Sequence, residues 1–402
     1  MLINANRSTS ITLTSNWIYV AKLGKVKYLD ISRARQLFPM LRTHVYLNNA
    51  STSPCPTPVR SAMAEAMEKW TTDAHVYESW MDNLQETKAL FSELIGAKKE
   101  EIAGITNTST GLSIVANMLP YKKGSNVVIN DMEFPANTYP WLNLKRRGVE
   151  VRVVKNVGGR IRLKDLEEAV DDHTAALSIS HVEFSNGFRN DLKAISEIVH
   201  RHGATFVVDA IQSAGALEID VRRQGVDFLA TSFHKWLLGP EGTGFLYVRE
   251  ELIDEFDPWA TGWLAVENPE DFDSMNLNFS KTAQKFETGT HNLLGYVGAK
   301  AALEIFHDIG MSDVERRILD LSGRLLEELE GLKVDIVTTK EERYRSGIVN
   351  FKVPEVDRVL EGLARRNIVV SKRTGGIRVS PHFFNVEDEL QQLCRAVKEL
   401  SE

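Results

Sequence analysis

The stretch DLKAISEIVHRHGATFVVD, at residues 191–209, decides the fold of this chain. Its first part predicts an amphipathic helix, because apolar side chains recur on one face and cationic side chains fill the last turn. Gly203 follows as a helix stop, and the run TFVVD at residues 205–209 predicts a buried strand that ends in an acid. A helix, a stop glycine and a buried strand together form one step of a parallel α/β sheet.

Further strands of the same kind are expected on both sides of this stretch, at residues 126–130, 149–154, 175–181, 228–231 and 244–248. Their nearly continuous apolar composition predicts a mostly parallel sheet that is covered by helices on both faces. The ligands of such sheets bind beyond the carboxyl ends of the strands, so the functional residues are expected there.

After about residue 305 the pattern changes. Long amphipathic helices at 313–332 and 386–400 surround strands at 348–353 and 376–380, which predicts a smaller α+β domain. We therefore expect three parts. Residues 1–45 form an N-terminal arm and a segment that packs on the small domain, residues 46–300 form the large domain, and residues 301–402 form the small C-terminal domain.

The composition is that of a globular protein. Of the 402 residues, 43% are hydrophobic and 26% are charged, which excludes an intrinsically disordered chain. The net charge of −7 and the lack of a basic tract argue against nucleic acid as a partner, and the apolar runs are too short to cross a membrane. The two cysteines form no CxxC motif and the first 28 residues lack a signal-peptide core, so we expect a cytoplasmic location.

Three residues carry the expected chemistry: Asp209, Gln212 and Lys235. Asp209 ends a buried strand, where a carboxylate is costly without a positive partner, and Gln212 follows it closely. Lys235 follows the next strand, and burial there would make its neutral amine available as a nucleophile. Such a pair suits pyridoxal phosphate, whose ring nitrogen needs an acid and whose aldehyde needs a lysine. Taken alone, the two residues would be better explained by a structural salt bridge, or by Lys235 as a surface lysine, because short patterns often match by chance.

Residues 207–248 resemble the class V aminotransferase family of fold-type I pyridoxal-phosphate enzymes, and the resemblance extends from Tyr46 to about residue 398. That family includes cysteine desulfurases, selenocysteine lyases, isopenicillin N epimerase and kynureninase. The resemblance implies a large domain with a seven-stranded, mostly parallel sheet between helices, and a smaller C-terminal domain. It also implies that Lys235 forms a Schiff base with the cofactor, that Asp209 keeps the ring nitrogen protonated and that Gln212 donates to the phenolic oxygen.

Other motifs imply further cofactor contacts by the same resemblance. Ser232 and His234 match phosphate ligands beside the lysine, and Thr108 and Ser109 match the contacts of the family's phosphate turn, here TNTSTG at residues 106–111. A hydroxyl-rich turn that opens a helix offers backbone N–H groups and a favourable dipole to a phosphate. As an isolated string, the same turn would be an ordinary helix cap.

Two more segments match the family's pattern. Phe134, in DMEFPAN at residues 131–137, takes the position of an aromatic side chain stacked on the cofactor ring. Thr290, in FETGTHN at residues 286–292, matches a residue that reaches across a homodimer to the partner's cofactor phosphate. The resemblance therefore implies a homodimer with shared sites.

The substrate is expected to be bound by arginine. Arg378, in GGIRVSPHF at residues 375–383, matches the family's ligand of the substrate carboxylate, and a guanidinium fork suits a carboxylate through two parallel hydrogen bonds. Arg373 is a second candidate for substrate binding, although a solvated surface arginine would fit the sequence equally well.

The chain departs from the desulfurase pattern at two places. The loop before Arg378 reads SKRTGGI at residues 371–377 and has no cysteine, while Cys55 and Cys394 both fit a structural role. A persulfide-forming cysteine desulfurase is therefore disfavoured. The second departure is Phe184, which lies near the position of a desulfurase asparagine that Ser185 or Asn186 would have to replace.

The sequence favours a pyridoxal-phosphate enzyme that acts at the α-carbon of a small amino acid, either an aminotransferase or a β-eliminating lyase. An epimerase similar to isopenicillin N epimerase is the alternative, with His181, His291 or His382 as a second acid. Kynureninase-like hydrolysis has support from Phe134 alone. A different class, a cofactor-binding protein without catalysis, also stays open. A Rossmann oxidoreductase would need a GxGxxG motif after the first strand, and the sequence has none.

Overall fold

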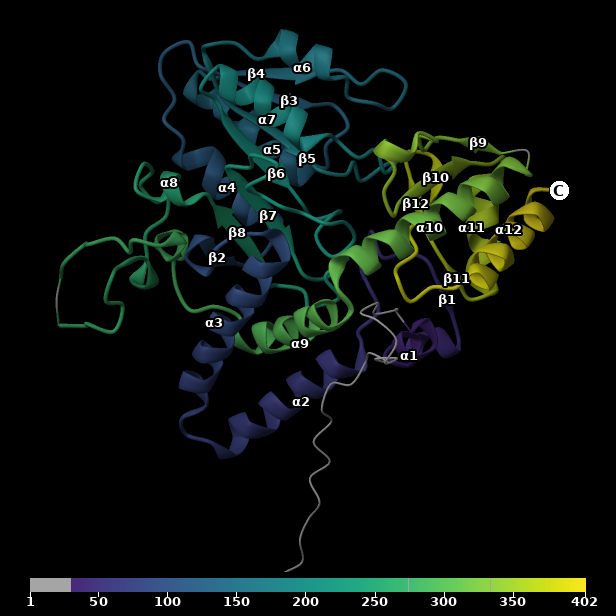
Figure 1. Cartoon of the computed structure of the whole chain (residues 1–402), viewed down its shortest axis with the longest axis horizontal. Helices are drawn as coiled ribbons and strands as arrows, with labels where there is room; N and C mark the ends of the chain where they lie inside the picture. The colour runs from purple at the N-terminus through teal and green to yellow at the C-terminus, as the bar shows by residue number, and fades with distance from the viewer. Residues whose placement is uncertain (1–29, 274, 333) are drawn as a thin grey trace, which may run out of the picture.

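The computed structural model describes residues 30–273, 275–332 and 334–402 (Figure 1). The expectations for the arm at residues 1–29 therefore lie outside the described residues. The described part of the chain has a larger α/β body and, beside it, a smaller part built mainly from residues 311–401.

The larger body is organised around a sheet of seven strands within the described residues. In order across the sheet these are β2 (Ile102–Ile105), β8 (Gly244–Val248), β7 (Phe228–Ser232), β6 (Thr205–Asp209), β5 (Thr174–Ser180), β3 (Asn126–Asn130) and β4 (Glu150–Val154). β8 runs antiparallel to both of its neighbours, while the pairs from β7 to β4 are parallel, so the predicted mostly parallel sheet is confirmed. The pattern did not predict β2, since IAGI is short and contains a glycine.

The register of the sheet places the ends of its central strands side by side. Ser180 at the end of β5 is paired with Asp209, and Asp209 is paired with Ala230 of β7. Because these three strands are parallel, the residues that follow them gather at one edge of the sheet.

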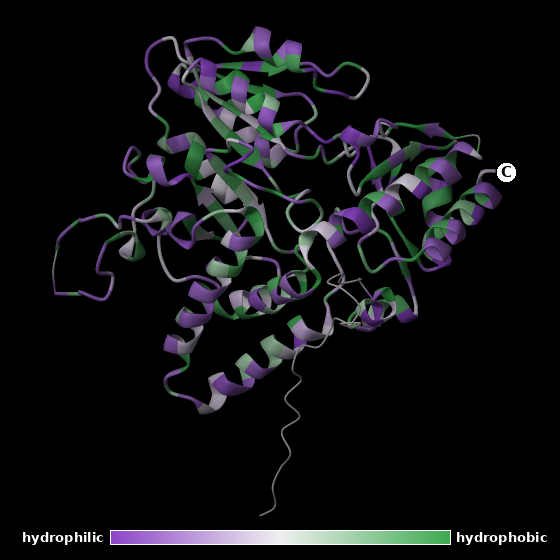
Figure 2. Cartoon of the chain, viewed as in Figure 1, coloured by the Kyte–Doolittle hydropathy of each residue, from purple (hydrophilic) through white to green (hydrophobic). Residues whose placement is uncertain are grey.

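Helices cover both faces of this sheet, as the apolar strands predict. Phe206 and Val208 of β6 belong to one buried cluster, whereas Val207 between them belongs to another on the opposite face. This follows from the two-residue period of a strand. Figure 2 shows the apolar residues concentrated on the strands and on the inner sides of the helices.

The helices of the larger body are α2 (Thr57–Thr72), α3 (Val76–Ile95), α4 (Thr108–Met118), α5 (Tyr139–Asn143), α6 (Leu163–Ala169), α7 (Leu192–Arg201), α8 (Glu250–Ile253) and α9 (Leu293–Ile309). α7 is the helix expected from residues 191–202. Its N-cap is Asp191, whose side chain accepts a hydrogen bond from the backbone N–H of Ala194. Short 3-10 helices lie at Pro39–Arg42, Lys99–Glu101, Pro135–Asn137, Leu144–Arg147, Trp263–Ala265, Ala283–Phe286 and Glu342–Tyr344.

The smaller part contains a four-stranded antiparallel sheet in the order β12 (Ser371–Arg373), β13 (Gly376–Val379), β10 (Val349–Lys352) and β9 (Asp335–Ile336). It packs with α10 (Met311–Glu330), α11 (Val356–Arg365) and α12 (Glu387–Ser401) around a third buried cluster. β1 (Val45–Tyr46), which follows α1 (Ile31–Gln36), pairs in parallel with β11 (Ile368–Val369). The boundaries at residues 45 and 300 stay predictions.

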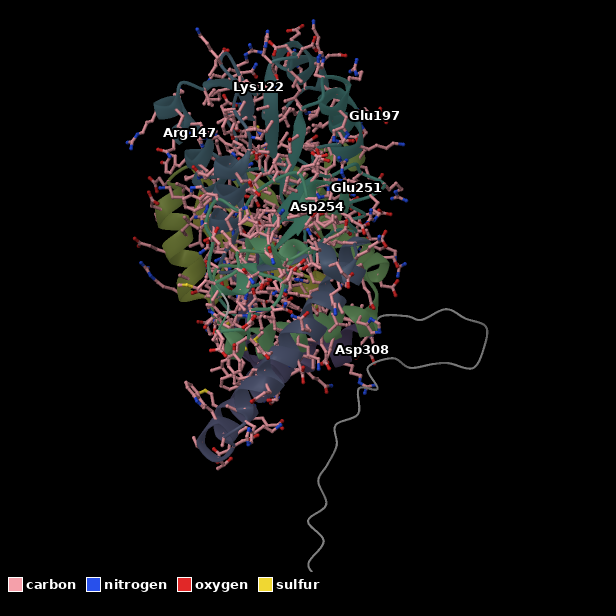
Figure 3. All side chains as sticks on the ribbon, turned by 90° about the vertical axis from the view of Figure 1, so that its left-hand side faces the viewer. Lys122, Arg147, Glu197, Glu251, Asp254 and Asp308 are labelled. Atoms are coloured by element: carbon pink, nitrogen blue, oxygen red, sulfur yellow. The ribbon has the colours of Figure 1, made fainter. Side chains whose placement is uncertain are left out.

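Charged side chains of both signs surround the molecule. Figure 3 shows Arg147 projecting on one flank and Glu197 on the opposite flank. None of the helices in the described ranges is both long and apolar enough to cross a membrane.

Candidate active site

A cavity of about 280 Å³ lies where the carboxyl ends of β6 and β7 meet the smaller part of the chain. It is lined by ten of the predicted site residues, namely Thr108, Ser109, Phe134, Asp209, Gln212, Ser232, His234, Lys235, Arg373 and Arg378. The structure therefore brings together residues that are up to 270 positions apart in the sequence (378 − 108). The local geometry then indicates which role each of these residues can have.

Asp209 is buried at the end of β6. Its Oδ1 accepts a hydrogen bond of 2.9 Å from the backbone N–H of Ile211, while Oδ2 has no hydrogen-bond partner among the described residues. Burial raises the pKa of Asp209 to about 6, against the opposing effects of that hydrogen bond and of the Lys235 charge. A buried carboxylate oxygen without a partner, beside a cavity, fits the N–H of a protonated ring nitrogen.

Lys235 lines the same cavity from the loop after β7. Burial lowers the pKa of its ammonium group to about 8; the charge of Asp209 opposes this shift, and the charges of Arg378 and Arg373 add to it. A lysine with this pKa has a substantial fraction of neutral, nucleophilic amine near neutral pH. Its Nζ lies 5.7 Å from the centroid of the Phe134 ring.

The loop that carries Lys235 is tied to the N-terminal segment of the larger body. The backbone carbonyl of His234 accepts hydrogen bonds from the Ser53 N–H at 2.9 Å and from the Thr52 hydroxyl at 3.1 Å. His234 itself is half-buried, and burial lowers its pKa. The N-terminal segment thus fixes the backbone next to the lysine.

Gln212 has a fixed orientation. Its Oε1 accepts a hydrogen bond of 2.9 Å from the indole N–H of Trp236, and its Nε2 donates to the backbone carbonyl of Ala50 at 3.0 Å. One N–H of the amide is left to donate into the cavity, where a phenolic oxygen would accept it.

The N-terminus of α4 opens onto the cavity beside β7. Asn107 caps this helix by accepting from the Thr110 N–H at 2.9 Å, and Ser232 Oγ accepts from the Thr108 N–H at 2.8 Å. The Thr108 and Ser232 hydroxyls lie 2.8 Å apart. Hydroxyls and backbone N–H groups at a helix N-terminus form a donor set that suits a phosphate dianion.

Two aromatic rings border the cavity. Phe134 is 44% exposed and meets the ring of Phe184 edge to face, with 5.2 Å between the centroids. Neither Ser185 nor Asn186 lines the cavity, so neither replaces the missing asparagine; the Asn186 amide donates to the Gly159 carbonyl instead.

Arg378 enters the cavity from β13 and is 1% exposed. Its Nη1 donates to the backbone carbonyl of Phe184 at 2.8 Å, and its Nη2 donates to Ser51 Oγ at 2.7 Å. Arg373, from β12, also lines the cavity, and its Nη2 lies 3.4 Å from the same Ser51 oxygen. Burial, and then the charge of Arg373, lower the pKa of Arg378 to about 9.

Thr290 is the one predicted site residue that does not line this cavity. It is exposed, and it follows Glu287, a buried carboxylate that binds Lys88 Nζ at 2.6 Å and His291 Nε2 at 2.8 Å. These two partners lower the pKa of Glu287 to about 2, against the effect of burial. The loop that carries Thr290 is therefore anchored, and its predicted role at a partner's cofactor stays a prediction.

The histidines proposed as second acids do not line the cavity. His181 and His382 are buried, and burial lowers the pKa of each to about 3, so both imidazoles are neutral at pH 7. His382 Nε2 lies 3.0 Å from the Trp236 carbonyl, and His291 is paired with Glu287. The epimerase alternative therefore gains no support.

Neither cysteine lines the cavity. Cys394 is buried in α12, where burial raises its pKa to about 12, and Cys55 is exposed with a pKa that burial also raises. Reactive thiols in enzymes usually have lowered pKa values, so both fit the structural role that the sequence predicts.

Sequence reasoning missed two groups of residues. Ser51, which contacts both arginines, follows β1 with no local motif, so no signal in the sequence could have identified it. The second group is a pair of buried acids, Glu133 and Glu183, which both accept hydrogen bonds from Asn130 Nδ2, at 2.7 and 3.2 Å. Burial raises the pKa of Glu133 to about 7 and that of Glu183 well above its usual value.

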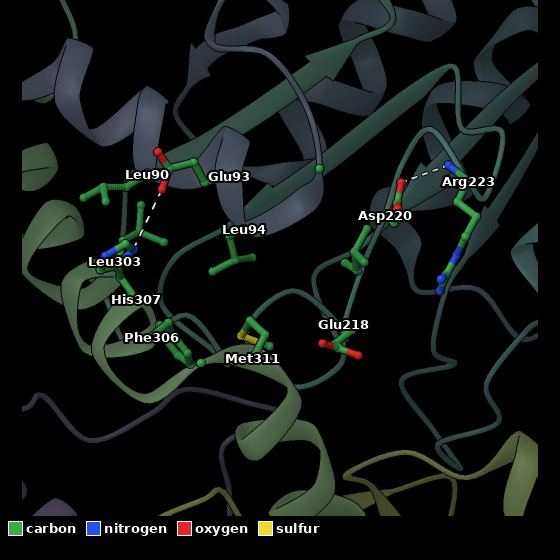
Figure 4. A pocket seen from close by; sticks show the side chains of 13 residues that line it. Leu90, Glu93, Leu94, Glu218, Asp220, Arg223, Leu303, Phe306, His307 and Met311 are labelled. Atoms are coloured by element: carbon green, nitrogen blue, oxygen red, sulfur yellow. Dashed lines mark hydrogen bonds and ion pairs between the residues drawn. The ribbon is translucent and has the colours of Figure 1, made fainter. Parts of the chain in front are cut away.

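A larger cavity, of about 460 Å³, lies between α3, α9 and the segment at residues 218–223 (Figure 4). Its side chains are mainly apolar and acidic, including Glu93, Glu218 and Asp220, and it contains no lysine. It therefore offers no amine for imine chemistry, and size alone does not identify the catalytic cavity.

Comparison with known proteins agrees with the geometry. The aminotransferase class V family model matches residues 45–397. A probable cysteine desulfurase of Methanothermobacter thermautotrophicus is 32% identical over 400 residues, which cover 93% of this chain and 99% of that protein. An uncharacterized aminotransferase of Bacillus subtilis is also 32% identical, over 89% of this chain and 94% of that protein.

Solved structures show the same fold. The apo structure of a cysteine desulfurase from Thermococcus onnurineus matches with a TM-score of 0.85 and 29% identity, covering 92% of this chain and 98% of that one. A cystine C–S lyase in complex with cysteine persulfide matches with a TM-score of 0.84 and 23% identity, over 90% and 99% of the two chains, which shows a shared fold. The predicted fold, family and cofactor class are confirmed, and the chain belongs to the class V aminotransferase family of pyridoxal-phosphate-dependent enzymes.

Proposed function

We propose that this protein is an aminotransferase or a β-eliminating C–S lyase that acts at the α-carbon of a small amino acid, with Lys235 as its central catalytic residue. The observation that carries the proposal is the meeting of Lys235, Asp209 and Arg378 in one cavity. Lys235, an amine with a lowered pKa, suits the aldehyde of the cofactor, and the buried acid Asp209 suits its ring nitrogen. The buried guanidinium of Arg378 suits the carboxylate of the substrate.

The residues of the cavity fit pyridoxal phosphate. The unpartnered Oδ2 of Asp209 would accept the ring N–H, the hydroxyls of Thr108 and Ser232 with the N-terminus of α4 would hold the phosphate, and Phe134 would contact the ring. Ser109, Gln212 and His234 complete the donor set in the same cavity. When bound, the cofactor supplies an aldehyde that forms a carbon–nitrogen double bond with amines and a ring that withdraws electrons from the substrate's α-carbon.

The chain's own residues then perform the proton transfers. Arg378 binds the α-carboxylate through its guanidinium fork and so fixes which bond of the α-carbon is perpendicular to the ring. Lys235 Nζ would take the proton from the substrate's α-carbon as a general base. Asp209 keeps a proton on the ring nitrogen, where its carboxylate is within the low-dielectric core of the sheet.

The lack of a cysteine in the cavity supports release of sulfur by β-elimination over transfer to a protein thiol, if the substrate contains sulfur. The relatives named cysteine desulfurases make a sulfur-containing amino acid a natural first substrate to test. Transamination is the other outcome; it would expel no group from the β-carbon and would need a keto-acid acceptor, and the proton on Lys235 would not go to a departing group.

We further propose that the protein is a cytoplasmic homodimer in which Thr290 contributes to the partner's phosphate site. Support comes from the motif at residues 286–292 and from the exposure of Thr290 on a loop that Glu287 anchors.

A labelling experiment tests the central assignment without relying on turnover. The purified protein is loaded with pyridoxal phosphate, reduced with borohydride and digested, and the labelled peptide is identified by mass spectrometry. We expect the label on Lys235 and its loss in Lys235→Ala. A label on any other lysine, with none on Lys235, would remove the proposal.

A substrate screen then decides between the two reactions. Small amino acids are added to the loaded protein, with and without a keto-acid acceptor, and keto acid, ammonia and sulfide are measured separately. Keto acid and ammonia formed together without an acceptor, with sulfide when the substrate contains a thiol, indicate elimination, whereas keto acid that depends on the acceptor indicates transamination.

A further inference from the structure

The cavity contains two guanidinium groups without an acidic partner among the described residues. Arg378 is almost fully buried, yet all three of its hydrogen bonds go to neutral groups: the Phe184 carbonyl and the hydroxyls of Ser51 and Ser371. Arg373 donates to the Lys372 carbonyl and to Ser51 Oγ, which are also neutral. A buried or half-buried charge without a counter-ion is costly, so both groups are prepared for an anion.

The two arginines come from one hairpin and lie on the same face of it. In the register of β12 and β13, Arg378 is opposite Ser371, and Arg373 is opposite Gly376. Directly opposed residues of an antiparallel pair project to the same face, so both guanidinium groups are directed toward the cavity. Gly376 adds no side chain there, and a Cβ at that position would lie 2.2 Å from Asn350 Oδ1.

With the cofactor phosphate held at the N-terminus of α4, an ordinary amino acid as substrate leaves the charge of Arg373 unbalanced. Asp209 is the one acidic residue that lines the cavity within the described residues, and it faces Lys235 and the cofactor's ring nitrogen. The α-carboxylate of a substrate provides one negative charge, which Arg378 binds at the buried end. Arg373, which is only half-buried, is left without an anion.

We propose that the substrate carries a second anionic group, a side-chain carboxylate or sulfinate, which pairs with Arg373 while Arg378 holds the α-carboxylate. This inference rests on the proposed function, since it specifies the substrate of the same site. The cavity of about 280 Å³ must hold the cofactor as well as the substrate, so the acidic side chain is short. The substrate class is therefore a short dianionic amino acid such as aspartate or cysteine sulfinate.

The competing use of Arg373 is to neutralise the cofactor phosphate. The donor set at the N-terminus of α4 already provides for the phosphate, through Thr108 and Ser232 and the adjoining backbone N–H groups. The experiment nevertheless measures cofactor affinity, so that the two uses give different results.

The test uses the cofactor-loaded protein and follows the change in the cofactor's visible absorbance as amino acids are added. Two pairs compare an acidic with a neutral side chain: aspartate with asparagine, which has nearly the same shape, and cysteine sulfinate with the smaller alanine as the minimal neutral reference. We expect the acidic member of each pair to bind at least tenfold more tightly. In Arg373→Gln this preference should disappear while the affinity for alanine changes less than twofold.

Two further variants serve as controls for the charge and for the shape of the Arg373 side chain. Lys372→Gln removes a positive charge next to Arg373, from a side chain that is exposed and paired with Asp357, and should leave the preference intact. Arg373→Lys keeps the charge but loses the fork, and should retain part of the preference.

The outcomes separate this inference from the proposed function. If the absorbance responds to amino acids without preference for acidic ones, or if Arg373→Gln weakens all of them equally, the inference is wrong and the proposed function stands. If Arg373→Gln loses cofactor, the arginine serves the phosphate and the inference is also wrong. If no amino acid, acidic or neutral, changes the absorbance, the proposed function itself fails.

Discussion

At the residue scale, the site depends on how burial changes the charge of single side chains. Lys235 and Asp209 are shifted in opposite directions by the same cause, since burial favours the neutral amine of the lysine and the neutral carboxyl of the aspartate. Their mutual attraction opposes both shifts. The cavity thus holds an amine that is ready to react and an acid that becomes fully charged when a ring N–H reaches it.

The pKa of Lys235, about 8, predicts how the cofactor-free protein captures pyridoxal phosphate. Only the neutral amine reacts, so the rate of covalent capture should rise with pH up to about 8 and then level off. An unshifted lysine would give a rate that continues to rise toward pH 10. Stopped-flow absorbance measures the rate, and a profile without a plateau between pH 8 and 9 would contradict the assignment.

Ser51 predicts a second effect at this scale. Its hydroxyl orients Arg378 at 2.7 Å, and hydrogen bonds to charged groups contribute about 1.5–3 kcal/mol. Ser51→Ala should therefore weaken amino-acid binding by about tenfold or more, while cofactor affinity stays the same. Ser53→Ala is the matched control, because that hydroxyl bonds Asn49 and does not line the cavity. Equal affinities in the two variants would remove Ser51 from the site.

Residue identities could be predicted only where a local pattern marks them. Lys235 and Asp209 follow recognisable strands, so their placement in one site followed from the parallel sheet. Ser51 depends on β1 pairing with β11, which joins segments more than 300 positions apart and leaves no local signal. Glu183 had no visible role in the sequence either, because a buried acid is recognised only by what surrounds it.

At the scale of elements, the strands and long helices were predictable because they are buried in regular patterns. β3, β6 and β8 have the bounds that the apolar runs predict, and α7 has the expected caps. β2, β9 and β12 were missed, because each is short and is defined by its partner strand and not by its own composition. Of the hairpin that presents both arginines, β13 was predicted and only β12 was missed.

The loop that carries Thr290 yields a prediction at the element scale. Glu287 and Lys88 form a buried ion pair, and removing one partner of such a pair typically costs about 3–5 kcal/mol. Glu287→Gln should therefore lower the free energy of unfolding by that order, as measured by urea denaturation. The control variant Glu65→Gln breaks an exposed ion pair with Lys69 on α2 and should change the free energy of unfolding little.

The pH dependence of the same variant provides an independent check. The folded-state pKa of Glu287, about 2, is below its ordinary value of 4.5, so its ionisation stabilises the fold above about pH 4.5. That stabilisation is lost as the pH falls from 4.5 toward 2. The stability difference between wild type and Glu287→Gln should shrink over this window, and a constant difference would show that the carboxylate charge is not the cause.

At the scale of the whole molecule, the proposed homodimer predicts complementation between defective chains. If Thr290 serves the partner's site, a hybrid of Lys235→Ala with Thr290→Ala contains one site with an intact lysine and an intact threonine. Mixed dimers should then recover activity that neither variant shows alone, at up to half of the wild-type level per dimer. Activity no higher than the average of the separate variants would place Thr290 outside the shared site.

The residues that line the cavity come from distant parts of the chain, including Ser51 near its start, Lys235 in the middle and Arg378 near its end. The hydrogen bond from Arg378 to the Phe184 carbonyl fastens the last stretch to the central sheet. A truncation that extends past Ser51 from one side, or past Arg378 from the other, would therefore remove a residue that lines the cavity.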